Sequence, residues 1–334
     1  MRGLPGLLLA STFVLGVACS TGSSVWPDLD YADEGMPFDP GLIIDSTESL
    51  TDPSSFPQAT DIQAFLKQTP YGTESFLATY SSNGVSAAMA IANAAITYQL
   101  NPLLFLVRAE MDQGLVAATS YPSPASRVEF VFGCGCAETG VTASCDPLLA
   151  GFDRQVDCLA REIRSSLDSA CGVTHLTSGG WGSGKTSTTI DGVDVTPENE
   201  GTAVLYQYTP LVLERRAGGN WFFWNVYQLY ANSIGYPGSF MQAWIGDACC
   251  GDTACAAIQG GTCAVNVPGG MCTATCSASQ PCPMDPDRHA VCTSLSGQGF
   301  CLLDCSASPC RAGYLCQPVA LVGGGQGSAC LPAN

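Results

Sequence analysis

The chain has 334 residues, with 29 Asp and Glu against 12 Lys and Arg, a formal net charge of −17 at pH 7, and 19 cysteines. Proteins that bind nucleic acid neutralise phosphates with Lys and Arg, so this charge excludes a nucleic-acid partner. The length is sufficient for two domains, and the many cysteines predict disulfide bonds formed in an oxidising compartment.

The first 19 residues have the pattern of a secretory signal: Arg2, an apolar run over residues 7–17, and Ala18 before Cys19. That run is too short to span a membrane, and no later stretch reaches the necessary length of about 20 apolar residues. Residues 15–19 resemble a bacterial lipobox, in which Cys19 is lipidated and becomes the N-terminus. We therefore expect an outer-membrane lipoprotein that meets the membrane only through its lipid anchor. An ordinary secretory signal is the alternative.

Residues 20–60 are predicted to form a flexible acidic tether, because they contain eight Asp and Glu and no Lys or Arg. From residue 61 to residue 246, helical signals dominate, with apolar residues at helical spacing. The predicted helices cover residues 61–67, 71–80, 85–99, 102–113, 152–167, 197–206 and 221–230.

The most strongly marked helix lies between Asn101 and Gly114. Asn101 is a favourable N-cap, Pro102 suits the first helical position, and Gly114 supplies a left-handed stop. The residues between them are apolar on nearly every side of the helix, which predicts a buried helix. Its second half nevertheless contains Arg108, Glu110 and Asp112.

Residues 101–115 resemble a segment of lysozyme-like glycan hydrolases of the lytic-transglycosylase and bacterial glucosaminidase type. These proteins carry Asn-Pro, an apolar helix and then Glu-Gln-Gly-Leu, and the Glu is the catalytic acid. Here the corresponding position is Asp112, followed by Gln113, so an Asp stands where the family has Glu. Glu110 lies about 200° away around the helix and is the alternative acid.

Two further stretches carry the same resemblance, which covers residues 60–235. Residues 195–210 contain Ala-Val-Leu-Tyr-Gln-Tyr-Thr-Pro, and residues 219–224 read Gly-Asn-Trp-Phe-Phe-Trp. In the middle segment, Gly151-Phe-x-x-Gln155 is also similar. The resemblance implies that Tyr206 lines the cleft beside the acid. It further implies a substrate-binding role for Gln113, Gln155, Tyr206 and Tyr208.

The implied function is cleavage of β-1,4 bonds in peptidoglycan strands with a single acid and without a cofactor or metal. Such an acid must be protonated near neutral pH. An apolar pocket and the end of a helix raise the pKa of Asp112, whereas an ion pair with Arg108, one turn earlier, lowers it. The alternative function is a catalytically weak or inactive envelope protein that binds glycan or mediates adhesion.

A nucleotide is not an expected partner. Residues 179–186 match the phosphate-loop pattern Gly-x-x-x-x-Gly-Lys-Thr. That pattern needs a buried strand before it and a helix after it, and neither is predicted here.

From residue 247 onwards the chain contains 13 cysteines and little apolar sequence. Cys-x-x-x-Cys recurs about 30 residues apart, which predicts two small disulfide-rich modules over residues 247–334. Five cysteines lie between residues 134 and 171, so both groups are odd once Cys19 is set aside. Complete pairing then requires a bridge between the groups, with Cys249 or Cys250 the nearest candidate. The predicted fold is mainly α: a lysozyme-like helical domain over residues 61–246, followed by a disulfide-rich region of loops and short strands.

Overall fold

The computed structural model describes residues 38–139, 142–212, 219–236, 244–284, 288–306 and 309–333. The predicted signal, the lipidation site at Cys19 and the first part of the predicted tether lie outside the described residues. No helix of the described part is long and apolar enough to cross a membrane.

The expectation of a mainly α fold is wrong. Of the described residues, about 35% lie in the seven α-helices and the short 3-10 turns, and a further 17% lie in short strands. Strand pairs occur between the helices as well as in the cysteine-rich region. The helical periodicity of the sequence identified the apolar segments. It did not identify the Gly-rich and Ser/Thr-rich connections, where the backbone pairs as hairpins.

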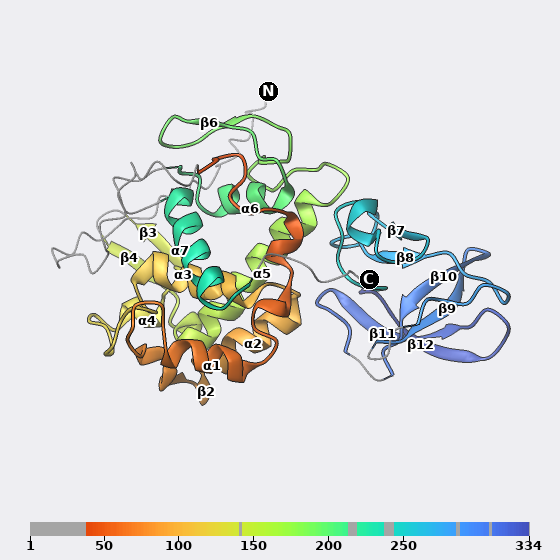
Figure 1. Cartoon of the computed structure of the whole chain (residues 1–334), viewed down its shortest axis with the longest axis horizontal. Coiled ribbons are helices and arrows are strands. Elements are labelled where there is room, and N and C mark those ends of the chain that lie inside the picture. The colour runs from red at the N-terminus through yellow and green to blue at the C-terminus, as the bar shows by residue number, and fades with distance from the viewer. Residues whose placement is uncertain are drawn as a thin grey trace, which may run out of the picture. The chain divides into compact units, whose positions relative to one another are not determined.

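Helices form the region from residue 38 to residue 236, and α3 contacts both α2 and α7 (Figure 1). The helices are α1 (Ala59–Lys67), α2 (Ala87–Tyr98), α3 (Pro102–Gln113), α4 (Ser126–Glu129), α5 (Phe152–Ala170), α6 (Glu200–Tyr208) and α7 (Gly219–Ser233).

The predicted ends and burial of α3 are confirmed. The Asn101 side chain accepts a hydrogen bond from the backbone N–H of Leu103 at 2.9 Å. Gly114 takes the left-handed conformation with φ of 63°, which stops the helix without a steric penalty. Every residue from Pro102 to Glu110 is buried. Helix α3 is therefore fixed at both ends, and its last turn holds the two candidate acids.

Two other predicted helices differ from the structure. Within residues 71–80, only Phe76–Ala78 are helical, as a 3-10 turn capped by the Ser75 hydroxyl. The helix expected from Pro197 begins at Glu200 as α6, because the side chain of Asn199 caps it by accepting from Thr202 N–H at 2.8 Å.

Three hairpins interrupt the described part of the helical region. Strands β1 (Ser81–Ser82) and β2 (Val85–Ser86) are joined by Asn83-Gly84, both with positive φ, as a tight hairpin turn requires. Strands β3 (Cys136–Thr139) and β4 (Thr142–Cys145) are joined by the Cys136–Cys145 disulfide. The third pair is β5 (Ser187–Thr188) with β6 (Asp194–Val195).

The segment before α1 packs against the helical region. Ile43, Ile44, Leu50 and Phe56 are at most 5% exposed. The compact unit that contains the helices begins at Phe38. The segment from residue 38 to residue 58, which its acidity suggested was a tether, therefore contributes apolar side chains to the core.

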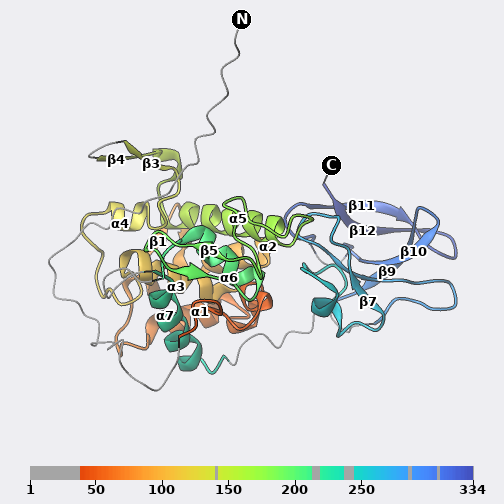
Figure 2. The ribbon, with the colours of Figure 1, turned by 90° about the horizontal axis from the view of Figure 1, so that it is seen from above.

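The region from residue 244 to residue 333, the cysteine-rich region, is built from three antiparallel strand pairs. They are β7 (Gly261–Cys263) with β8 (Cys272–Ala274), β9 (Ala290–Leu295) with β10 (Gln298–Leu303), and β11 (Tyr314–Ala320) with β12 (Gln326–Pro332). Figure 2 shows the last pair, with β11 beside β12. One of its two apolar clusters consists of Ile245, Ile258, Ala274 and six cysteines. Disulfides therefore take much of the place of a larger apolar core.

The predicted bridge between the two groups of cysteines is confirmed. Cys171, directly after α5, is bonded to Cys250. A backbone hydrogen bond of 3.0 Å from Ala312 to Thr97 also joins the helical and cysteine-rich regions. Six further disulfides lie within the described part of the cysteine-rich region: Cys249–Cys263, Cys255–Cys272, Cys276–Cys292, Cys282–Cys301, Cys305–Cys316 and Cys310–Cys330.

Candidate functional site

Asp112, in the last turn of α3, is bound to Arg108 one turn earlier. A single guanidinium nitrogen of Arg108, Nη2, lies 2.9 Å from Oδ1 and 3.0 Å from Oδ2 of Asp112. The side chain of Arg108 is 3% exposed and that of Asp112 is 11% exposed. Both oxygens of the candidate acid therefore accept hydrogen bonds from an internal cation.

Arg108 is itself held by the C-terminal end of α6. Its Nη1 donates to Thr209 Oγ1 at 2.8 Å. Its guanidinium carbon lies 4.5 Å from the centre of the Tyr208 ring, in the geometry of a cation–π contact. Three groups thus fix the position of Arg108, and movement away from Asp112 would break contacts with all of them.

Burial and the ion pair act on Asp112 in opposite directions. Burial raises the pKa of Asp112 to about 6, although the charge and hydrogen bonds of Arg108 lower it. Desolvation is the larger effect because most of the side chain is removed from water. Asp112 is consequently ionised and paired above pH 6, and it becomes protonated below.

Glu110 is fully buried and faces away from Asp112, as the helical spacing predicts. Its Oε2 accepts hydrogen bonds from the backbone N–H groups of Val116 at 2.8 Å and Ala117 at 2.9 Å. Burial raises the pKa of Glu110, while these backbone hydrogen bonds lower it. The hydroxyls of Tyr71 and Tyr230, 3.1 Å apart, border the same carboxyl. Glu110 holds the loop after α3 in place and has no exposed surface for a substrate.

Tyr208, rather than Tyr206, lies beside the ion pair of Arg108 and Asp112. Tyr206 is fully buried, its hydroxyl donates to the Pro40 carbonyl at 3.0 Å, and its ring stacks on Trp181 at 4.8 Å. The half-buried Tyr208 donates from its hydroxyl to the carbonyl of Phe132 at 3.3 Å. Of the two predicted tyrosines, only Tyr208 therefore contacts the region around Asp112.

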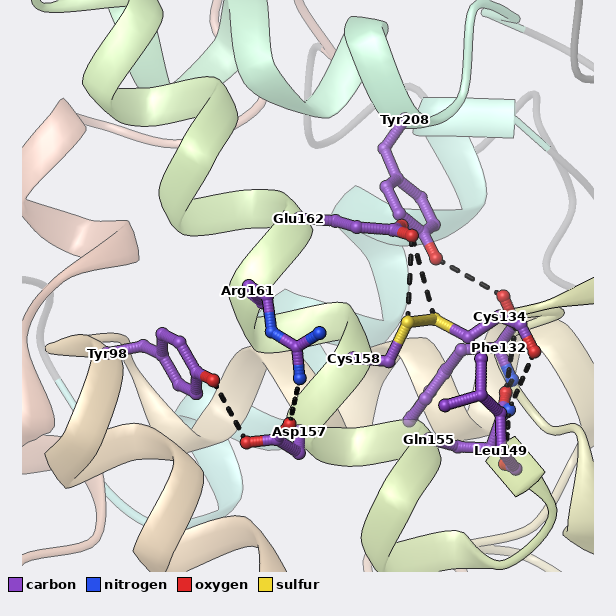
Figure 3. The surroundings of a disulfide bond; sticks show 10 residues. All are labelled: Tyr98, Phe132, Cys134, Leu149, Gln155, Asp157, Cys158, Arg161, Glu162 and Tyr208. Carbon is purple, nitrogen blue, oxygen red and sulfur yellow. Dashed lines mark hydrogen bonds and ion pairs between the residues drawn. A yellow bond between two sulfur atoms is a disulfide. The ribbon is translucent and has the colours of Figure 1, made fainter. Parts of the chain in front are cut away.

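Gln155 of α5 anchors the loop before β3 (Figure 3). Its Oε1 accepts from the N–H groups of Phe132 and Cys134, and its Nε2 donates to the carbonyls of Cys134 and Leu149, all between 2.9 and 3.2 Å. Since the side chain is fully buried and its amide atoms are occupied, it positions the loop that receives the Tyr208 hydroxyl. The contact that Gln113 makes here is through its backbone, whose carbonyl accepts a hydrogen bond from the guanidinium of Arg127.

The structure adds a carboxylate that the sequence did not indicate. In Figure 3, Glu162 of α5 points toward the Cys134–Cys158 disulfide, with Oε1 3.8 Å from Cys134 Sγ and 3.6 Å from Cys158 Sγ. Burial raises the pKa of Glu162. Burial is also the main cause of the raised pKa of Tyr208, to which the nearby charges of Asp112 and Glu162 both contribute. Tyr208 therefore has carboxylates from two helices as neighbours. The only sequence feature that could have indicated this contact is that Glu162 follows Cys158 by four residues on a predicted helix, which places both side chains on one face.

The described residues contain four groups of three potential metal ligands, with ligand atoms within 4.8 Å of one another. Every group includes cysteines that are in disulfides, and a bridged sulfur is not the thiolate that a metal prefers. The oxidised form of these groups does not supply three free ligands.

A cavity of about 590 Å³ lies elsewhere in the helical region, lined by residues of α1 and by Ser233 and Ile234. None of the predicted site residues lines it. The chemistry of the cavity is mixed, with Phe56 and Phe65 beside Asp61 and Gln68.

The fold and the site define a disulfide-rich chain in which the last turn of a buried helix holds an ion pair that is largely removed from water. Comparisons with protein-family models, with curated proteins and with solved structures found no match to this chain.

Proposed function

We propose that the helical region binds β-1,4-linked amino-sugar strands of peptidoglycan, and that it cleaves them weakly and only below pH 6. The observation that carries this proposal is the ion pair of Asp112, in which both carboxylate oxygens accept from Arg108. The resemblance of residues 101–115 to glycan hydrolases places Asp112 at the position of the acid. The resemblance is the reason for proposing a glycan ligand, and the ion pair is the reason for proposing that cleavage is weak.

The ion pair limits catalysis because a general acid has to carry a proton and present it to the leaving oxygen. At pH 7.5, Asp112 is ionised and has no proton to give. Below pH 6 it is protonated, its attraction to Arg108 weakens, and its partly exposed side chain becomes available. The side chain of Asp is also one methylene shorter than that of Glu, and a displacement of about 1 Å lowers a rate roughly a hundredfold.

The proposed place of action is the cell envelope, with the chain held by a lipid on Cys19. The lipobox-like residues 15–19 support the anchor. The nine disulfides of the described residues support an oxidising compartment. We assign no nucleotide, nucleic acid, metal or cofactor to this function.

Binding is tested by sedimentation of the purified chain, without its signal, with peptidoglycan sacculi at pH 7.5. The wild type and Asp112→Asn are expected to sediment equally, because Asp112 is not free to contact the strand at this pH. A cellulose pellet serves as the control for a β-1,4 glucan without amino sugars. If the wild type stays in the supernatant with sacculi, or sediments equally with cellulose, the proposed ligand is wrong.

A further inference from the structure

Three aromatic rings form a cluster beside the loop that follows α3, which we call the tyrosine platform: Phe76, Tyr80 and Tyr121. The centre of the Tyr121 ring lies 5.7 Å from that of Tyr80 and 6.0 Å from that of Phe76. Tyr121 is 48% exposed, Tyr80 is half-buried, and Phe76 is 8% exposed. The buried Phe76 thus supports two tyrosine rings that face solvent in part.

The backbone under the tyrosine platform is attached to the loop that follows α3. The N–H of Phe76 donates to the carbonyl of Ala118 at 2.8 Å, and the hydroxyl of Ser75 donates to the carbonyl of Leu115 at 3.1 Å. This is the loop that Glu110 holds through Val116 and Ala117. The position of the platform is therefore fixed relative to the end of the helix that carries Asp112.

Carboxylates and an amide border the tyrosine platform. The pKa of Tyr80 is raised by burial, by Tyr121 and by the nearby charges of Glu129 and Asp153. Asp153 Oδ1 accepts from Ser82 Oγ at 2.7 Å and from Asn83 Nδ2 at 2.9 Å, which fixes the carboxylate against the β1–β2 hairpin. Asp153 and Glu129 thus place carboxylate oxygens near Tyr80, and one oxygen of Asp153 already accepts two hydrogen bonds.

Two arginines that share helices with Glu129 and Asp153 donate to backbone carbonyls. Arg127 donates to the carbonyl of Gln113, and Arg154 donates to the carbonyl of Leu148 at 2.9 Å. Two carboxylates beside the rings disfavour an anionic ligand and favour one that donates hydrogen bonds. A single exposed tyrosine is common on protein surfaces, but here two rings in contact, a buried support and acceptors at the edge occur together.

We propose that the tyrosine platform is a stacking subsite for a neutral N-acetylated amino-sugar ring. A pyranose ring has an apolar C–H face, which suits the flat face of Tyr121, and a rim of hydroxyl and amide N–H donors, which suits Asp153 and Glu129. This assignment rests on the proposed function, because it places a ring of the glycan strand next to the end of α3.

The test is isothermal titration calorimetry at pH 7.5 with chitotetraose, a neutral β-1,4 tetramer of N-acetylglucosamine. Tyr121→Ala is expected to weaken binding about tenfold, because it removes the stacking surface. Tyr121→Phe keeps the ring and is expected to stay within roughly twofold of the wild type. Ile96→Ala is the matched control, since Ile96 on α2 is 63% exposed and lies outside the platform.

Equal binding by the wild type and Tyr121→Ala would overturn the subsite and leave the proposed function standing. Failure of the wild type to bind chitotetraose would overturn the subsite in any case. Sedimentation with sacculi then decides the proposed function separately. If Ile96→Ala weakens binding as much as Tyr121→Ala, the loss is not specific to the rings, and the assignment is also wrong. Circular dichroism of each variant establishes that the helices remain.

Discussion

The helical region and the cysteine-rich region are stabilised by different interactions. The helical region buries complete apolar side chains around α3, such as Leu103, Leu104 and Phe105, all 0% exposed. The cysteine-rich region has two small clusters, one of which consists largely of cysteine. The first region owes its fold to apolar burial, and the second owes its fold to covalent bridges.

This difference also determines which of the two regions can hold charged side chains out of water. A large apolar core can hold Arg108 and Asp112 out of water and change the pKa of the acid. A small region with six internal bridges keeps its shape without such a core. The candidate site accordingly lies in the helical region.

Reduction is expected to have the largest effect, and to separate the two regions. Each bridge that is lost removes roughly 2 to 5 kcal/mol, so reduction should unfold residues 244–333. Helices α1 to α3 contain no cysteine and should stay protected. Hydrogen-exchange mass spectrometry with and without reductant measures both regions at once. Simultaneous loss of protection in α3 would show that the helical region also depends on the bridges.

Removal of Arg108 is expected to have the next largest effect. Arg108→Met removes hydrogen bonds to Asp112 and Thr209 and should lower the free energy of unfolding by roughly 2 to 3 kcal/mol. The matched control is Arg161→Met, because Arg161 and Asp157 form an ion pair of the same spacing on α5 but are 63% and 49% exposed. That control should change stability by less than about 1 kcal/mol. Urea unfolding measures the loss of stability in both variants. Equal losses for Arg108→Met and Arg161→Met would mean that burial of the pair of Arg108 and Asp112 has no energetic consequence.

The pH dependence of stability is expected to be smaller and has a defined sign. The pKa of Asp112 is about 6 in the folded chain, against about 3.9 in an unfolded one, so the folded state binds the proton more tightly. This group therefore stabilises the fold fully below pH 4, and that stabilisation is lost as the pH rises through 6. The expected change between pH 4 and pH 7 is about 2 kcal/mol.

Urea unfolding of the wild type and Asp112→Asn at pH 4, 5, 6 and 7 isolates this contribution. The difference in unfolding free energy between them should move in favour of Asp112→Asn as the pH rises. Glu110 and Glu162 also have raised pKa values and are present in both proteins, so they cancel. A difference that does not depend on pH would place the pKa of Asp112 near its unfolded value.

Local features of the sequence predicted local features of the structure well. The cap at Asn101, the stop at Gly114 and the pairing of Arg108 with Asp112 all depend on residues within a few positions of one another. The odd counts of cysteines also predicted a bridge between the two groups, because complete pairing within two odd groups is impossible; the structure shows that the partners are Cys171 and Cys250.

Features that depend on distant parts of the chain were not predictable. Tyr206 is in the core because its hydroxyl reaches Pro40, in a segment whose acidity suggested a tether. Glu162 approaches Tyr208 only because α5 and α6 pack together. The hairpins consist of short polar strands whose pairing depends on turns such as Asn83-Gly84 rather than on an apolar pattern.

The central claim is that Arg108 prevents Asp112 from acting as an acid at neutral pH. The most direct measurement is the release of soluble fragments from purified sacculi by the wild type at pH 5 and pH 7.5, with Asp112→Asn as the control. The account predicts slow release at pH 5, none at pH 7.5, and none from Asp112→Asn at either pH. Release at pH 7.5 equal to that at pH 5, or release that persists in Asp112→Asn, would contradict it.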